Sequence, residues 1–262
     1  MSEQPVLLEK TGGVLFVTLN RPDKKNAMSL ALLEDLVAAL DEAEADSEIR
    51  VLVIRGADGN FCAGADIKDM NAARALGEGA PKAIYDLSIA VGKMVSRFAS
   101  SPLTIITVLE GAVMGGGFGL ACVSDVAIAS HTVRFALPET TLGLLPAQIA
   151  PVLIERIGYS EAKRLSVTGA RIPASEALRI GLVHHVTQDV EEAIREVIES
   201  ALRCAPEAVS ATKKLLWEAR FTHSDQMVER AADLFVDAVL GEEGKEGTIA
   251  FAEKRKARWM PQ

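Results

Sequence analysis

Short, almost continuously apolar runs alternate with amphipathic helical stripes through the first two thirds of the chain. The run Leu103–Val108 lacks the polar alternation of a half-exposed strand, which is typical of a strand covered on both faces. Between the runs Val14–Leu19 and Val51–Ile54, Ser29 is expected to cap a helix with one apolar stripe. The pattern predicts an α/β core with a largely parallel sheet. Two further runs are also expected to be strands, Val126–Ala129 and Val133–Ala136.

The pattern becomes helical after about Pro173. Apolar residues recur at helical spacing within the segments 190–202 and 227–238, and Gly241 is expected to end the second helix. Two interpretations of these stripes stay open. They pack in the core of their own chain, or they form contacts between subunits.

Charge and cysteine usage restrict the function classes. The 262 residues carry a net charge of −8, which argues against nucleic-acid binding. Three cysteines without a CxxC pair indicate a reducing compartment, since one stays unpaired in any disulfide scheme. Neither a signal peptide nor an apolar run of about 18 residues is present, so we expect a cytoplasmic protein without membrane association.

Several motifs with a known chemical meaning are absent from the sequence. It contains no P-loop, GxSxG, HExxH or EF-hand pattern. The four histidines form no ligand cluster, and the adjacent pair His184 and His185 lies in an apolar run where a structural role is expected. No metal site is therefore predicted.

A glycine-rich segment, Gly111–Ala121, follows the run Leu103–Val108 directly. Glycine in a helix costs about 1 kcal/mol relative to alanine, so four glycines in five positions suggest that the backbone approaches something closely. A helix that starts after a strand offers free N–H groups to an anion or a developing oxyanion. The alternative is a tight crossing of two elements that needs glycine only for packing.

A second segment, Phe61–Met70, has the same setting. It follows an apolar run, places small residues at a turn, and has Asp66 positioned to cap the next helix. Exposed amides that follow two strands of one sheet could converge on a single oxygen atom, as in an oxyanion hole.

Five segments of the chain form a recognisable series. They are LNRPDKKNAMS from Leu19, FCAGADIKDM from Phe61, GAVMGGGFGLA from Gly111, FALPETTLGLLP from Phe135 and FAEKRKARW from Phe251. In order and spacing they resemble the enoyl-CoA hydratase/isomerase family, the crotonases. The resemblance implies an α/β spiral of ββα repeats with CoA and the active site in residues 1–190. It also implies a helical trimerisation region in residues 191–262, and homotrimers that pair into hexamers.

Position by position, the resemblance places the oxyanion-hole amides on Ala65 and Gly116. It also implies that Phe251 and Lys254 close over the nucleotide of CoA, often from a neighbouring subunit. The basic tail around Lys254 suits a polyanionic ligand, although a solvated helix face would look the same. CoA is part of the substrate, so no separate cofactor is expected. The remaining positions that match the CoA groove are Lys24, Lys25, Ala27, Ala63, Asp66 and Ile67.

The chain departs from the family pattern at one catalytic position. Hydratases of the family hold water with two glutamates, and the first corresponds to Gly119 here, whereas the second is present as Glu139. Glu139 is therefore the expected acid–base residue. A glycine at 119 is also expected to free volume beside the acyl chain. Gln148 is a candidate for contact with the acyl group, or for packing within its loop.

Three functions follow from these residues. The first is hydration of an enoyl-CoA thioester, and the resemblance is greatest to hydratases of branched glutaconyl-CoA thioesters. These are 3-methylglutaconyl-CoA or isohexenylglutaconyl-CoA, from leucine or acyclic-terpene breakdown. The second is a Δ3,Δ2-enoyl-CoA isomerase with Glu139 as the sole proton shuttle. The third is a non-catalytic acyl-CoA-binding protein. No residue for a distal carboxylate can be identified from the sequence.

Overall fold

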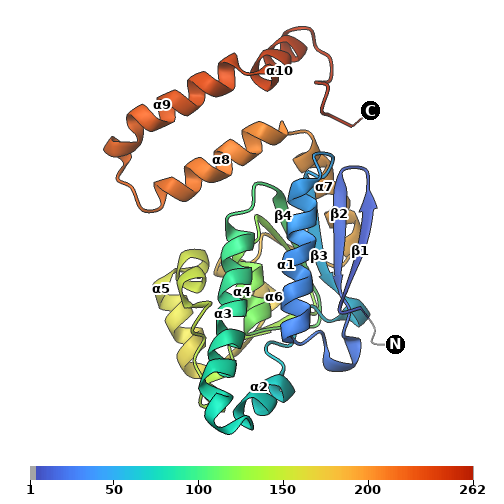
Figure 1. Ribbon diagram of the computed structural model, residues 1–262. Helices are drawn as coiled ribbons and strands as arrows, with labels where there is room; N and C mark the ends of the chain where they lie inside the picture. Colours follow the sequence, from blue (N-terminus) through green and yellow to red (C-terminus); the bar gives the residue numbers. More distant parts are fainter. Residues whose placement is uncertain (1–3, 262) are drawn as a thin grey trace.

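The computed structural model describes residues 4–261, in which a six-stranded sheet forms the centre of the core (Figure 1). Its strand order is β1-β2-β3-β4-β6-β9, and every neighbouring pair is parallel except the hairpin β1–β2. The predicted parallel α/β sheet is confirmed. Its strands are β1 (Val6–Thr11), β2 (Val14–Leu19), β3 (Val51–Gly56), β4 (Thr104–Leu109), β6 (Val126–Ser130) and β9 (His185–Thr187).

A second, smaller sheet has the order β5-β7-β8. β5 (Ala112–Met114) runs parallel to β7 (Arg134–Ala136), and β8 (Arg171–Pro173) closes the sheet in the antiparallel direction. β5 also continues the main-sheet strand β4 after a two-residue turn, so the glycine-rich segment passes from one sheet to the other. The start of the next helix then lies against the segment that follows β3, since a Cβ on Gly117 would be 2.7 Å from the Cys62 Cβ.

Helices cover the main sheet on both faces, as the apolar strands predict. In β3, Leu52 and Ile54 pack with α1 (Leu30–Ala45) and α3 (Ala80–Ala99) in the larger core. The alternate residues Val51 and Val53 pack on the other face, with α7 (Val190–Leu202). Since successive side chains of a strand point to opposite faces, a run buried on both sides must be apolar throughout.

Two predicted helix caps are confirmed. Ser29 accepts a hydrogen bond from the Leu32 N–H at the start of α1, and Asp66 accepts one from the Lys68 N–H at the start of α2. No helix within residues 4–261 is both long and apolar enough to cross a membrane. The other core helices are α2 (Ile67–Arg74), α4 (Gly116–Val123), α5 (Ala150–Thr168) and α6 (Ala174–Arg179), with short 3₁₀ turns η1 (Pro22–Lys24), η2 (Ala57–Gly59), η3 (Gly77–Gly79) and η4 (Glu139–Leu142).

Three helices extend away from the core, and we call them the C-terminal arm (Figure 1). They are α8 (Pro206–Ala219), α9 (Ser224–Leu240) and α10 (Glu242–Ala252). Helix α9 ends before Gly241, as expected, but it buries only Met227. The interpretation that its stripe packs in the core of its own chain is therefore wrong. Helix α7 does pack in the core of its own chain, because its apolar side chains lie against the main sheet.

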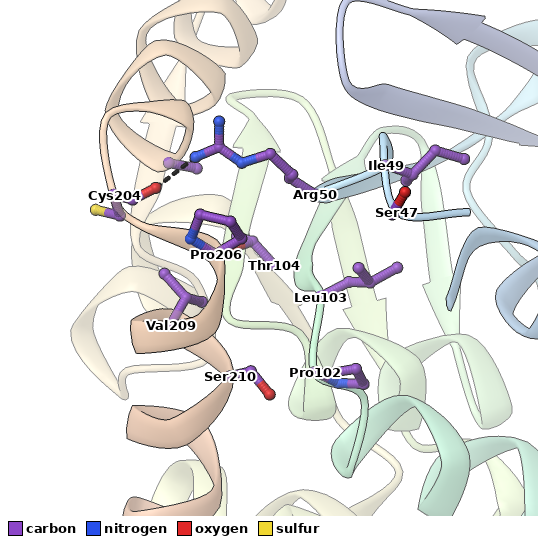
Figure 2. Close-up of a pocket in the computed structure, with 11 residues that line it drawn as sticks. Ser47, Ile49, Arg50, Pro102, Leu103, Thr104, Cys204, Pro206, Val209 and Ser210 are labelled. Atoms are coloured by element: carbon purple, nitrogen blue, oxygen red, sulfur yellow. Dashed lines mark hydrogen bonds between the residues drawn. The ribbon is translucent and has the colours of Figure 1, made fainter. Parts of the chain in front are cut away.

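Polar contacts attach the arm to the core. The Arg50 guanidinium donates to the Leu202 carbonyl at 2.9 Å, to the Cys204 carbonyl, and to the Trp259 carbonyl at 2.7 Å. Lys213 Nζ donates to the Leu103 carbonyl and to Asp125 Oδ2. Figure 2 shows Arg50 beside a small cavity of about 100 Å³ at this junction, lined by residues of both the core and α8.

Candidate active site

A cavity of about 420 Å³ opens between α2, α3, the start of α4 and the segment that joins η4 to α5. The residues predicted for catalysis, Ala65, Gly116 and Glu139, all line it. They come from three separate parts of the sequence, and the topology brings them together. The lining is otherwise mostly apolar, which is the usual composition of a site for a small organic ligand.

The two segments predicted to supply amides lie side by side. The Cys62 N–H donates to the Ala112 carbonyl, and the Met114 N–H donates to the Cys62 carbonyl, both at 2.9 Å. The two segments approach so closely that a Cβ on Gly115 would lie 3.5 Å from the Gly64 Cα. Gly115 has φ 52° and ψ −118°, which is a conformation accessible only to glycine without strain.

The amides of Ala65 and Gly116 are both available at this point. Gly116 is the first residue of α4, so its N–H has no partner within the helix. The residues on either side of Ala65 both pair with Met28. The Met28 N–H donates to the Gly64 carbonyl, and the Asp66 N–H donates to the Met28 carbonyl. Within residues 4–261, neither the Ala65 nor the Gly116 N–H donates to a backbone carbonyl. An oxygen bound in the cavity could accept from them.

Glu139 is the carboxylate of this cavity. It begins η4, directly after β7, and its Oε1 would lie 3.0 Å from a Cβ placed on Gly115. Its Oε2 is buried and has no hydrogen-bond partner among the described residues. Burial raises the pKa of Glu139, because desolvation disfavours the charged form. A carboxylate with a raised pKa beside two free amides can exchange a proton with a bound molecule.

Gly119 does not leave open volume beside the cavity, contrary to the expectation. A Cβ placed on Gly119 would lie 2.3 Å from Cγ2 of Ile149, and Ile149 itself lines the cavity. The isoleucine therefore occupies the space that a side chain at position 119 would need. The physical reason is close packing, since a protein interior fills space that a missing side chain would leave.

Gln148 packs against α3 and also lines the cavity, so packing within the loop is observed and contact with the acyl group stays a prediction. Its Nε2 donates to the Ser88 hydroxyl of α3 at 3.1 Å. Its Oε1 lies against Gly92 of α3, where an added Cβ would be only 2.4 Å away. Gln148 and Ser88 thus form a polar pair in an apolar wall.

Most residues predicted to bind CoA lie in two adjacent segments, near η1 and before α2. The Ala63 N–H donates to the Lys25 carbonyl at 3.0 Å, which joins the two segments. Asp66 is buried, and its carboxylate is bound to Arg21 and to the N-terminus of α2. Burial raises the pKa of Asp66, but these hydrogen bonds outweigh the effect and lower it. Lys24 ends η1, Ala27 is buried, and Ile67 is the exposed first residue of α2.

Phe251 and Lys254 are not brought to these segments within one chain. Both lie at the end of the C-terminal arm, and α10 is at the opposite end of the molecule from α2 (Figure 1). Phe251 is 87% exposed. The basic tail is also partly neutralised, because Glu246 pairs with Arg255 and Arg258.

The structure adds two polar residues to the cavity that the sequence analysis did not find. Arg74 ends α2 and Ser88 lies in α3, and both line the cavity. Neither belongs to a recognisable motif. The only signal for Arg74 was a cation in the last turn of a short helix, which is an ordinary feature of helices.

No histidine is among the described residues that line the cavity. His184 accepts a hydrogen bond from the Ala127 N–H through Nδ1, and burial lowers its pKa to about 4, aided by the adjacent Arg156. It therefore has the structural role that was expected. Residues 4–261 contain no group of three or more His, Cys, Asp or Glu side chains that could hold a metal ion.

The main sheet, the second small sheet, the cavity and the helical arm together define a protein of the crotonase fold. A sequence model of the enoyl-CoA hydratase/isomerase family matches residues 9–262. The chain belongs to the enoyl-CoA hydratase/isomerase family, and it is an enzyme.

Both sequence and structure relatives cover nearly the whole chain. The short-chain-enoyl-CoA hydratase of Clostridium acetobutylicum is 33% identical over 96% of this chain and 95% of its own length. The structure of Pseudomonas aeruginosa AtuE is 49% identical with a TM-score of 0.94, and the match covers 98% of this chain and 100% of that one. An enoyl-CoA hydratase/isomerase from Marinobacter aquaeolei is 46% identical with a TM-score of 0.93, over 97% of this chain and 98% of that one.

Proposed function

We propose that this enzyme is an enoyl-CoA hydratase that adds water across the 2,3 double bond of a branched, glutaconyl-type thioester. The supporting observation is that Glu139 lines one cavity with Ala65 and Gly116, and that within residues 4–261 neither the buried Oε2 of Glu139 nor the two amides have a hydrogen-bond partner. Relatives named hydratases support the reaction type. The candidates for the substrate are 3-methylglutaconyl-CoA and isohexenylglutaconyl-CoA.

In the proposed mechanism, the thioester carbonyl oxygen accepts hydrogen bonds from the Ala65 and Gly116 N–H groups. These bonds strengthen as negative charge moves onto the oxygen, so they stabilise the enolate-like transition state. Glu139 takes a proton from water while the hydroxyl oxygen bonds to C3. The proton held by Glu139 is then available for C2, so the elements of one water molecule are added. The raised pKa of Glu139 suits both steps.

Turnover in labelled water tests this proposal. The purified enzyme is given 2-enoyl-CoA and 3-enoyl-CoA thioesters in H₂¹⁸O, and loss of the 2-enoyl absorbance with ¹⁸O in the product is expected. Glu139→Gln should lower kcat by about 10²- to 10⁴-fold, because it removes the acid–base group. Glu34→Gln, an exposed carboxylate of α1, is the matched control and should leave kcat unchanged.

Isomerisation is the second candidate, because the cavity holds one carboxylate and Ile149 fills the space beside Gly119. One carboxylate suffices to move a proton between C2 and C4. Migration of the double bond without ¹⁸O uptake would support the isomerase and contradict the hydratase. Turnover that is unaffected by Glu139→Gln would favour a non-catalytic acyl-CoA-binding role or another base.

We also propose that the enzyme is a homotrimer or a dimer of trimers, in which the arm of one subunit completes the CoA site of another. The exposed apolar residues of α9 and the distance of Phe251 from the other predicted CoA residues support this arrangement. Light scattering coupled to size-exclusion chromatography tests the subunit number. Phe251→Ala should raise KM for the thioester, and a monomeric active enzyme would contradict the proposal.

A further inference from the structure

The cavity carries a second charge that the proposed chemistry does not use. Among its lining residues only Glu139 and Arg74 are charged, and the others are apolar, small or neutral. Arg74 is an exposed side chain in the last turn of α2, whereas Glu139 is half-buried at the start of η4. One negative and one positive group therefore border the same largely apolar space.

The fold makes little use of the Arg74 guanidinium. Its hydrogen bond is to Asn71 Oδ1 on its own helix, at 3.5 Å, which is long for such a bond. No carboxylate of residues 4–261 lies within 4.0 Å of it. Arg21 is a useful contrast, since it donates to Asp66 at 2.7 Å and to the Ala27 carbonyl, and so stabilises the loop before α2. The donors of Arg74 are thus available to a ligand.

The position of this cation restricts what the cavity can hold. The cavity lined by Ala65 and Gly116 is also bordered by α2 and α3, whose lining side chains are mostly apolar, so it offers an acyl group an apolar space. A free carboxylate in such a space needs a partner, because burial of an unpaired charge is costly. Arginine is the residue best suited to bind a carboxylate, through two parallel N–H···O bonds. The positive charge of Arg74 would also offset the repulsion between such a carboxylate and Glu139, whose pKa an unpaired nearby anion would raise.

We propose that Arg74 binds a carboxylate at the distal end of the acyl group and thereby selects acidic acyl-CoA thioesters. This inference rests on the proposed function for the reaction, but it concerns recognition of the substrate by another residue of the same cavity. Arg74 is a specificity residue here, and its removal leaves the amides and Glu139 in place. An alternative anion, a phosphate of CoA, is an outcome that the experiment separates.

The experiment uses two thioester pairs that differ only in the distal carboxylate. Turnover is measured with 3-methylglutaconyl-CoA and 3-methylcrotonyl-CoA. Affinity is measured by calorimetry with the saturated pair 3-methylglutaryl-CoA and 3-methylbutanoyl-CoA, which needs no reaction. Arg74→Ala should lower kcat/KM for the acidic substrate by about 10- to 100-fold, mainly through KM, as expected for a hydrogen bond to a charged group. The neutral substrate should change by less than about 2-fold.

Two further variants separate charge from geometry. Arg74→Lys keeps the positive charge but loses the planar guanidinium that binds a carboxylate through two N–H groups. It should therefore recover only part of the preference for the acidic thioester. Lys82→Ala removes an exposed cation of α3 that does not line the cavity, and should leave the preference unchanged.

Three results would overturn the proposal. The first is an equal loss of kcat/KM for the acidic and the neutral thioester in Arg74→Ala, which would assign Arg74 to a phosphate of CoA. The second is no loss of kcat/KM for either thioester in that variant. The third is a wild-type enzyme that binds the neutral saturated thioester as tightly as the acidic one. If turnover fails with every thioester while the calorimetric preference persists, the hydratase proposal fails and the role of Arg74 stands.

Discussion

Helices α1 and α9 have similar lengths and similar amphipathic stripes, but only α1 covers its stripe within the chain. α1 buries six apolar residues against the sheet and α3, while α9 buries only Met227 and leaves Phe235 70% exposed. Their sequences predict the same structure, a helix with one apolar face. Periodicity therefore identifies an apolar face but not the surface that covers it.

The two regions are also held in place by different interactions. Apolar contacts with both faces of the sheet dominate in the core, where residues such as Leu36 and Leu52 are fully buried. The C-terminal arm is attached at its base through Arg50 and Lys213. In α10, Glu246 is held by Arg255, whose hydrogen bond lowers the pKa of Glu246 to about 2. The stability of the core should therefore be less sensitive to changes in the arm.

The largest expected difference is in the response to truncation of a leucine. Leu36→Ala in α1 should lower the free energy of unfolding by about 2 to 5 kcal/mol, because it leaves a cavity in a packed interior. Leu240→Ala in α9, where the side chain is 64% exposed, should change it by less than about 0.5 kcal/mol at protein concentrations that favour monomers. Urea denaturation of both variants measures the difference. Equal losses would show that the arm belongs to the cooperative core.

The next largest change in stability is expected where Gly119 packs against Ile149. Gly119→Ala should destabilise the enzyme by about 1 to 3 kcal/mol, because its Cβ would overlap Ile149 Cγ2. The loss should be smaller when Ile149→Ala is already present, so the two substitutions should be strongly non-additive. A double-mutant cycle of unfolding free energies measures this coupling. Additive losses would mean that Ile149 does not occupy the space at position 119.

A smaller effect is expected at the exposed face of α9. Phe235→Ala should weaken subunit association by about 1 to 2 kcal/mol, as is common for a buried aromatic residue at an interface. It should leave the unfolding of the dilute monomer unchanged, since Phe235 has no core contacts to lose. Sedimentation over a range of concentrations measures association. An unchanged assembly would assign this face to some other surface or to solvent.

The smallest predicted effect is the pH dependence of Glu139. Its pKa in the folded enzyme is raised above the ordinary value of 4.5 by burial, so the folded state holds the proton more tightly than the unfolded state. The stability from this group is present below about pH 4.5 and is lost as the pH rises through the raised pKa. Glu139→Gln does not titrate, so its stability relative to the wild type should increase from pH 4 to pH 8. Thermal unfolding at both values measures the trend.

Most of the strands with apolar runs could be predicted from the sequence. Val14–Leu19 agrees with β2 at both ends, and the predicted strands in β3, β4, β6 and β7 agree to within two residues at each end. The strands β5, β8 and β9 were missed, because three residues give little periodicity; β7, which also has three residues, was found as part of the run Val133–Ala136. β1 was also missed, because an edge strand with five exposed residues lacks the continuous apolar pattern.

The candidate site shows the same division. Ala65, Gly116 and Glu139 were selected from local segments and a family resemblance, and the structure brings all three to one cavity. Arg74 and Ser88 were not found, because nothing in their local sequence distinguishes them. The filling of the space at Gly119 by Ile149, which is 30 residues away, could not be predicted either. Packing between distant segments has no local signature.

The amino-acid sequence was enough to identify the apolar strands of the core, the starts of α1 and α2, and the family that the chain resembles. Backbone geometry and apolar periodicity act over a few residues, so they can be recognised in the sequence. Folding in three dimensions was needed to show which apolar faces are covered, that Ile149 occupies the space beside Gly119, and that a cation from α2 borders the same cavity as Glu139. These depend on contacts between distant segments, which only folding in three dimensions determines.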